Sequence, residues 1–250
     1  MRALRICADG AGASRLEALA LPFMCFGPTM TADDSARAPR PELAVAHRAV
    51  RTSRRVTSDD GRQIVFVVDG EPSVTTTYMR TTLSRGDVLF LDGADRETFT
   101  ISAGSDCRFV QLGVTDDWTP EGVVAPPIDD EGGPPLVQHM YVEDERAWFR
   151  DADTLFDDDA PRPVARAMFM CLSPDQFGDW HTEVATSLVV VLAGGFELEV
   201  GGGGGEAKVF RAGDVCLVQD HTGQGHISRT HGETRFVAIS VPEEQVWPIR

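Results

Sequence analysis

The sequence lacks the cysteine patterns that stabilise small domains. Its five cysteines are an odd number and include no C-x-x-C pair, so neither a disulfide framework nor a zinc ribbon is expected. It also lacks an apolar amino-terminal signal and any run of about 18 uncharged apolar residues. We therefore expect a soluble protein of a reducing, cytoplasmic compartment that makes no contact with a membrane.

Basic residues are few compared with acidic ones. The 250 residues include 23 lysines and arginines against 39 aspartates and glutamates, which gives a formal net charge of −16. Such a chain would repel a polyanion, so no nucleic-acid partner is expected. The hydrophobic share of 42% is large enough for a folded core, which excludes global disorder.

The negative charge is concentrated in residues 114–160, which hold fourteen acidic and two basic residues. Within this segment, the prolines and paired glycines of VVAPPIDDEGGPP (123–135) interrupt helix and strand alike, and residues 157–159 are all aspartate. The segment is predicted to be an acidic connector that also contains the start of the second half. A docking site for a cationic partner is the alternative.

One strand pattern occurs on both sides of this connector. In the C-terminal half, SLVVVLAGGFELEV and AKVFRAGDVCLVQD are short β-branched and aromatic runs separated by Gly-Gly or Gly-Asp turns. RQIVFVVDGEPSV and TTLSRGDVLFLDG repeat this pattern in the N-terminal half. Aligning Gly70 with Gly194 brings Gly86 within three residues of the register of Gly213.

Two further segments, LRICADGAGASRLEALALPF and MYVEDERAWFRDADTLFDDD, are also alike. An internal duplication explains both similarities. Short strands separated by turns every 8 to 12 residues or so predict an all-β sandwich or barrel. We therefore divide the chain into an N-terminal half (1–113), the connector (114–160) and a C-terminal half (161–250).

A family resemblance is clearest in GDWHTEVATSLVVVLAGGFELEV (178–200) and RAGDVCLVQDHTGQGHIS (211–228). These segments resemble the two motifs of the cupin superfamily, in the form found in small bacterial cupins with a Trp-His start and a D-x-T-G-x-G-H turn. With both halves counted, the chain resembles a bicupin, which implies two tandem jelly-roll (double-stranded β-helix) barrels. Cupins include dioxygenases, isomerases, cyclases and non-catalytic binding proteins, so the fold alone does not define the function.

Three side chains in these segments are candidate metal ligands. Residues i and i+2 of a strand point to the same face, so His181 and Glu183 would present an imidazole and a carboxylate together. His226 resembles the last cupin histidine and would supply the third donor. Two histidines and one carboxylate suit Fe(II) and also accept Mn, Ni, Co or Zn, so we expect a divalent metal at these residues.

The motifs also differ from the cupin pattern. Ser187 stands where the first motif has a glutamate, Gln219 replaces the proline of the second, and the histidine of the second motif comes two residues late. The alternative is that His181 and His226 are hydrogen-bonded pocket residues, or are partly exposed at the mouth of the barrel, and that Glu183 is solvated.

Further residues near these motifs are candidates for catalysis or substrate binding. Glu183 or His221 would move a proton in an enzyme, and His221 is also an alternative ligand. Met168 and Met170 alternate along one strand and would line the substrate pocket, although such methionines more often belong to the core. Trp180 would either stack on a substrate or cover the mouth of the barrel.

The N-terminal half lacks the metal donors. Counted from the equivalent glycines, Thr57 and Phe99 stand at the positions of His181 and His226. Neither side chain can replace an imidazole, so this half is expected to hold no metal. Its interior is expected to be filled by apolar side chains, among them Phe66, Phe90 and Phe99.

The remaining histidines are expected to be peripheral. His47 and His139 lie in loop or connector context, where surface placement is the usual outcome, and His231 in RTHGE is predicted to lie at a hairpin tip.

Two functions from different classes remain open. The first is a bicupin metalloenzyme acting on a small oxygen-rich or aromatic substrate, such as a dioxygenase or a polyketide-type cyclase. The second is a non-catalytic cupin that binds a small molecule or has a structural role. In either case a homodimer is expected, because cupin barrels have open sheet edges that are commonly paired.

Overall fold

The computed structural model describes most of the chain, namely residues 1–26, 47–56, 61–92, 98–118, 134–201, 204–243, 247 and 249. Its elements are strands, with one named 3₁₀ turn at Asp153–Phe156, so the all-β prediction is confirmed. Within the described residues, no helix has the length and apolar character needed to cross a membrane.

The N-terminal half contains two sheets. The large sheet has the order β2-β1-β8-β5-β10-β4. Its strands are β1 (Ala3–Ala8), β2 (Ser14–Ala18), β4 (His47–Ser53), β5 (Gln63–Asp69), β8 (Val88–Leu91) and β10 (Arg108–Val114). The small sheet has the order β7-β6-β9. Its strands are β6 (Ser73–Thr76), β7 (Arg80–Thr82) and β9 (Phe99–Ser102).

The C-terminal half also contains two sheets. The large sheet has the order β12-β11-β18-β15-β20-β13-β3. Its strands are β3 (Met24–Phe26), β11 (Val137–Glu143), β12 (Arg146–Asp151), β13 (Arg166–Leu172), β15 (Ser187–Ala193), β18 (Val215–Gln219) and β20 (Thr234–Ser240). The small sheet has the order β14-β19-β16-β17. Its strands are β14 (Phe177–His181), β16 (Gly195–Val200), β17 (Glu206–Arg211) and β19 (His226–Thr230).

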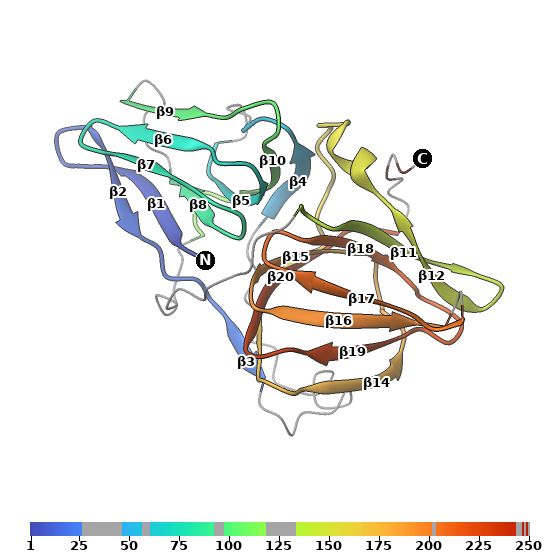
Figure 1. Ribbon diagram of the computed structural model, residues 1–250. Coiled ribbons are helices and arrows are strands. Elements are labelled where there is room, and N and C mark those ends of the chain that lie inside the picture. The colour runs from blue at the N-terminus through green and yellow to red at the C-terminus, as the bar shows by residue number, and fades with distance from the viewer. Residues whose placement is uncertain are drawn as a thin grey trace.

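The two halves repeat one topology and lie side by side (Figure 1). β1 runs parallel to β8 and pairs with β2, just as β11 runs parallel to β18 and pairs with β12. This agreement supports the predicted internal duplication. The expected closed barrels are not confirmed, because each half, as far as it is described, consists of two separate sheets.

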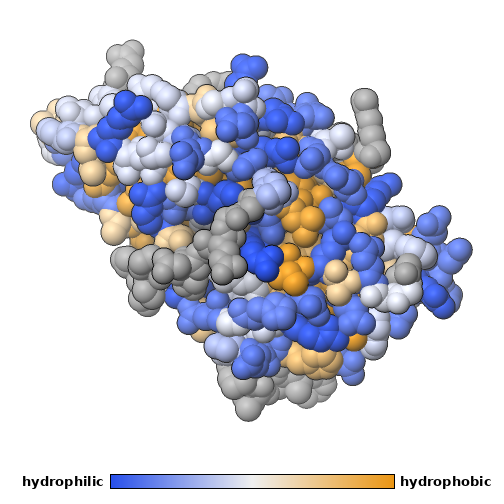
Figure 2. Space-filling view, viewed as in Figure 1, coloured by the Kyte–Doolittle hydropathy of each residue, from blue (hydrophilic) through white to orange (hydrophobic). Residues whose placement is uncertain are grey.

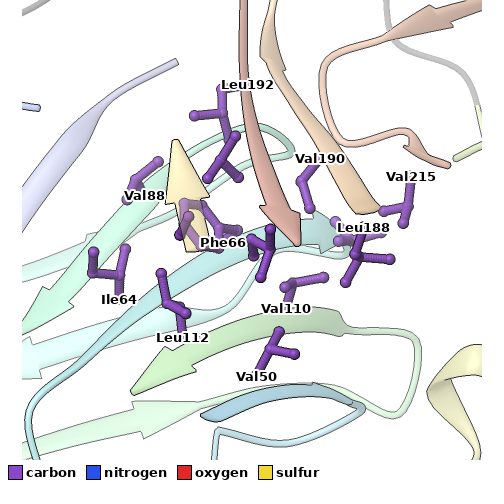
Figure 3. Close-up of a cluster of buried hydrophobic side chains, with 14 of the residues drawn as sticks. Val50, Ile64, Phe66, Val88, Val110, Leu112, Leu188, Val190, Leu192 and Val215 are labelled. Carbon is purple, nitrogen blue, oxygen red and sulfur yellow. The ribbon is translucent and has the colours of Figure 1, made fainter. Parts of the chain in front are cut away.

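The largest core cluster lies between the halves. The alternation of β5 sends Ile64 and Phe66 toward the C-terminal half, where they join Leu188 and Val190 of β15 in one cluster (Figure 3). Phe66 and Phe90 are both fully buried in this cluster. The expectation that they fill the interior of the N-terminal half is therefore wrong: they join the two large sheets face to face.

Each half has its own smaller core. Residues of the opposite strand parity, such as Val65 and Val67 of β5, pack between the large and small sheets of the N-terminal half. Val191 and Phe196 do the same in the C-terminal half. Both faces of each large sheet are thus covered, which accounts for the nearly uninterrupted apolar sequences of β5 and β15.

The glycines of the two Gly-Asp turns lie at the junction of the halves. Gly86 has a φ of +76°, and a Cβ there would overlap the carbonyl oxygen of Leu192 in the other half. Gly213 has a φ of +81°, and its Cβ would lie 2.7 Å from the carbonyl oxygen of Val68. Glycine is needed at both positions because the two halves approach each other reciprocally there.

The aspartates that follow these glycines fix the first strand of each half. Asp87 Oδ1 accepts the backbone N–H of Arg2, and Asp214 Oδ1 accepts the backbone N–H of Leu136 at 2.7 Å. Asp214 also forms a 2.7 Å ion pair with Arg85 across the junction. The two turns therefore hold each half together and also hold the halves to each other.

The acidic connector is only partly described. Residues 119–133, which include most of VVAPPIDDEGGPP, lie outside the described residues. In the aspartate run that follows, Asp157 pairs with Arg54 at 3.2 Å and Asp158 pairs with the buried Arg162 at 2.7 Å. These acidic groups thus have partners within the chain.

The surface in Figure 2 is mainly hydrophilic, and apolar side chains show in the middle of the view, near the junction of the halves.

Candidate metal centre

His181, Glu183 and His226 come together in the C-terminal half. His181 ends β14, Glu183 follows in the loop, and His226 begins β19. One potential ligand atom from each of the three residues lies within 4.8 Å of the other two. His181 and His226 are direct partners in the β14–β19 pair, and their ring centroids are 4.3 Å apart. The fold therefore brings together the three donors that were predicted from the sequence.

The route by which Glu183 reaches this cluster differs from the expected one. Strand parity was the argument for placing it beside His181, but β14 ends at His181 and Glu183 lies in the β14–β15 loop. The glycines of the T-G-x-G-H turn allow the close packing around it. Gly225 has a φ of +73°, and a Cβ there would overlap the carbonyl oxygen of His181.

Both histidine rings are oriented through Nδ1. His226 Nδ1 lies 2.6 Å from Asp220 Oδ2, and His181 Nδ1 lies 2.7 Å from the carbonyl oxygen of Asp179. A carboxylate and a carbonyl oxygen can only accept, so Nδ1 donates in both rings, and in the neutral form of each ring the lone pair is then on Nε2. A hydrogen bond from the second ring nitrogen to an oxygen is the usual arrangement of metal-binding histidines.

Asp220 is the deepest member of this group. Asp220 is fully buried and His226 is 3% exposed. Asp220 Oδ1 is buried and has no hydrogen-bond partner in the described part of the structure. His226 is therefore the hydrogen-bond partner of this carboxylate in the described structure. The carboxylate lies behind the His226 ring, on the side of Nδ1.

His221 lies outside the three-residue cluster. Its Nδ1 lies 3.3 Å from the carbonyl oxygen of Glu183, and its Nε2 lies 3.1 Å from Thr186 Oγ1. Gln219 also donates its side-chain amide to Thr186 Oγ1 at 3.3 Å. In this arrangement His221 supports the loop that carries Glu183; proton transfer by His221 stays a prediction.

Met168 and Met170 lie on the face of β13 that is turned toward the small sheet. Ala167 and Phe169, on the other face, are buried in the core between the halves. Met170 pairs with Phe236 of β20, which packs against the core between the two C-terminal sheets. Both methionines are only partly buried, and they form an apolar wall on this face of β13. That this wall lines a substrate pocket stays a prediction.

Trp180 is adjacent to His181 and is 38% exposed. Phe177 and Val184, on the same strand and the following loop, are exposed as well, at 55% and 90%. Exposed apolar side chains are therefore close in sequence to two of the three candidate ligands. Stacking of Trp180 on a substrate stays a prediction.

The N-terminal half has an apolar residue at the equivalent place. Phe99 pairs with Thr76 of β6, just as His226 pairs with Val200 of β16. Phe99 is partly buried and packs against the core of its own half. Thr57, the proposed counterpart of His181, lies outside the described residues.

The other histidines lie outside the candidate centre, in different parts of the structure. His231 follows β19 at an exposed turn, with Nε2 3.7 Å from Glu197. The predicted hairpin tip is wrong, because β19 and β20, on either side of this turn, lie in different sheets. His47 lies in β4. The expected surface placement of His139 is wrong, because this residue lies in β11 and is 3% exposed. Burial and the nearby Arg150, which donates Nε–H to His139 Nδ1, lower the pKa of His139 to about 4.

Asp220 and Asp179 are supporting groups that the sequence pattern did not predict. Asp220 was within reach, since it opens the D-x-T-G-x-G-H turn that already contained two candidate histidines. Asp179 acts through its backbone carbonyl, which leaves no signal in the residue type.

The donor set suits a divalent metal ion. Two imidazoles and one carboxylate match the ligands of Fe(II), Mn, Co, Ni or Zn sites. The oriented Nδ1 atoms leave the two Nε2 atoms as the lone pairs available to an ion. This chemistry fits a mononuclear centre with positions left for other ligands.

Comparisons with known proteins gave matches among solved structures. No protein-family model matches the chain, and no curated protein matches it. A cupin 2 conserved barrel domain protein from Leptotrichia buccalis is 16% identical, with a TM-score of 0.36, and the match covers 78% of this chain and 79% of that one.

Two further structures are similar at the same low level. A putative glyoxylate induced protein from Pseudomonas aeruginosa is 15% identical, with a TM-score of 0.33 and coverage of 78% of this chain and 72% of the other. Oxalate decarboxylase from Lactobacillus farciminis, in a formate complex, is 12% identical, with a TM-score of 0.31 and coverage of 82% and 80%. The chain is similar to these proteins, and the case for its metal centre rests on its own side chains.

Proposed function

We propose that this protein is a metal-dependent enzyme of the cupin type, with one divalent metal ion held by His181, Glu183 and His226. The observation that carries the proposal is the convergence of these donors within 4.8 Å, from segments that are about 40 residues apart in sequence. The supporting contacts of Asp220 and Asp179 orient the histidines as metal ligands require.

The chain's own residues would prepare the site for a small substrate. A bound metal would supply Lewis acidity or a place to bind a further small ligand beside the substrate. Asp220 fixes the His226 ring and stabilises positive charge near it. His221 and Thr186 hold the backbone of the Glu183 loop, and Glu183 supplies a carboxylate oxygen that can also hold a proton.

The surroundings favour a compact organic substrate with both polar and apolar parts. Met168 and Met170 offer an apolar wall, whereas the histidine and carboxylate cluster favours oxygen-rich groups. A dioxygenase or a polyketide-type cyclase, acting on an aromatic or oxygen-rich molecule, is the finer assignment that we propose. The second candidate is a non-catalytic small-molecule binder, for which the partly exposed apolar wall is the supporting observation.

Metal analysis of the protein purified without a His-tag tests the proposal. We expect about one Fe, Mn, Co, Ni or Zn per chain, with a sharp loss of metal in His181→Ala and His226→Ala. His231→Ala is the matched control, since this exposed histidine lies outside the cluster, and it should keep the metal. Circular dichroism would confirm that the variants are folded.

The two candidate functions give different outcomes in this experiment. Full metal content in both His181→Ala and His226→Ala would contradict the proposed centre. The same would hold for metal-free wild-type protein that does not take up any of the five ions when they are added. Either result would favour the non-catalytic binder.

A further inference from the structure

Two cysteines from distant parts of the chain are direct neighbours. Cys25 lies in β3 and Cys171 in β13, and the two are register partners in this parallel strand pair. β3 is the last strand of the C-terminal large sheet, although it comes from the N-terminal part of the chain. This pairing is independent of the candidate metal centre.

The strand geometry brings the two side chains to the same face. Neighbouring strands lie about 4.8 Å apart, and paired residues point in the same direction. This spacing falls within the range of about 4.4 to 6.8 Å between the Cα atoms of disulfide-bonded cysteines. The two thiols are close enough for Cys25 to raise the pKa of Cys171, and both are free.

The two thiols differ in accessibility. Cys25 is exposed, whereas Cys171 is buried, with 7% of its surface accessible. Burial raises the pKa of Cys171 to about 11, and a hydrogen bond from Arg235 acts in the opposite direction. An oxidant in solution would therefore meet Cys25 first, with Cys171 in place behind it.

We propose that Cys25 and Cys171 are a redox modification site, which forms a reversible disulfide by exchange with a small-molecule disulfide. Cys25 loses its proton, and its sulfur attacks one sulfur of the oxidant, forming a mixed disulfide and releasing one small thiol. Cys171 then loses its proton and attacks the Cys25 sulfur, and the second small thiol leaves. The protein gives up two electrons and two protons, and the small disulfide takes them up as two thiols.

The bond would fix β3 beside β13. Met24 and Met170 are the preceding register partners in the same strand pair, so they share the face of the sheet that is turned toward the small sheet. The disulfide would thus hold Met24 next to the apolar wall that includes Met170. Oxidation would fix the edge of that wall through a covalent bond.

Oxidised glutathione, added to the intact full-length protein, tests the proposal. Alkylation then counts the thiols that remain free, and we expect their number per chain to fall by two, from five to three. Peptide mapping without reduction should find Cys25 linked to Cys171, and a reducing agent should restore five thiols.

Matched variants separate this pair from the other cysteines. Cys25→Ala should keep its four thiols, whereas Cys171→Ala should retain a glutathione mixed disulfide at Cys25. Cys7→Ala is the control, since Cys7 pairs with Arg15 in another sheet, and it should still form the Cys25–Cys171 bond.

Other outcomes would overturn the proposal. They are a mixed disulfide that persists at Cys25 in the wild type, five free thiols after oxidation, and linkage of either cysteine to a different one. Because Cys25 is exposed, Cys25→Ala is expected to fold normally and keeps the test decisive even if Cys171→Ala does not fold.

Discussion

Replacing Asp220 by asparagine should weaken metal binding without removing any metal ligand. The Asp220 carboxylate is fully buried and lies 2.6 Å from His226 Nδ1. Asparagine keeps the shape and an acceptor oxygen, so the ring orientation can persist, but the negative charge behind His226 is lost. That charge makes the imidazole a better donor to a cation.

The expected loss of metal affinity can be estimated from other metal sites in which a group that supports a histidine ligand has been removed. Losing a group that supports a metal-binding histidine typically lowers metal affinity by 10- to 100-fold, which corresponds to about 1.4 to 2.8 kcal/mol. The upper part of this range is expected here, because Asp220 is shielded from water and its other oxygen has no described partner to share the charge.

Competition between the metal-free protein and a chromophoric chelator for Zn(II) or Mn(II) would measure this effect. Asp179→Asn is the matched control. The side chain of Asp179 accepts the backbone N–H of Trp180, and only the backbone carbonyl of Asp179 contacts His181. The substitution keeps that carbonyl, so the affinity should change little.

The stability of the metal-free protein gives a second measurement. Asp220→Asn exchanges a buried carboxylate for a neutral amide that costs less to bury, so unfolding in urea should need at least as much denaturant as in the wild type. Unchanged metal affinity in Asp220→Asn, or an equal loss in Asp179→Asn, would refute a specific role for the buried carboxylate.

Three other predictions concern the fold and assembly. Gly86→Ala should lower the free energy of unfolding by at least about 2 kcal/mol, because its Cβ would overlap Leu192 across the junction. Gly12 has a φ of +83° and no atom within 4 Å of an added Cβ, so Gly12→Ala should cost about 1 kcal/mol. Equal losses for the two variants in urea unfolding would contradict this reason. The pKa of His139 is lowered from 6.5 to about 4, so the unfolded state binds the proton more readily than the folded state. The free energy of unfolding should therefore fall by up to about 3 kcal/mol as the pH drops from 6.5 to 4. Unfolding curves measured at each pH should show a smaller fall for His139→Gln. Light scattering should give about twice 27.2 kDa for the proposed homodimer, and the monomer mass alone would refute it.

The strand pattern and the duplication were the parts of the fold that the sequence could predict. Alternating apolar runs and Gly-Asp turns are local signals, and each marks a strand or a turn whichever partner it meets. The repeated order of these signals also predicted that both halves share one topology. For the same reason, His181, Glu183 and His226 could be found, since they lie in or beside such motifs.

The packing between the halves could not be predicted in this way. All but the last residue of β5 are buried, so alternation tells which residues share a face but not which face meets the C-terminal half. Phe66 was accordingly assigned to the wrong core. The placement of β3 in the other half's sheet and the burial of His139 in β11 also depend on contacts between distant segments, for which no local signal exists.

The repeated topology makes the difference between the halves informative about the site. Phe99 and His226 occupy the same place in β9 and β19, so the fold itself does not require an imidazole there. The small sheet of the C-terminal half has β14 beside β19, and the described small sheet of the N-terminal half ends at β9. β14 carries His181 to the side of His226, so the candidate site needs both this strand and the histidine in β19. A histidine at a place where the same topology accepts phenylalanine, with a second histidine on the neighbouring strand, favours a selected site over a chance grouping of polar side chains.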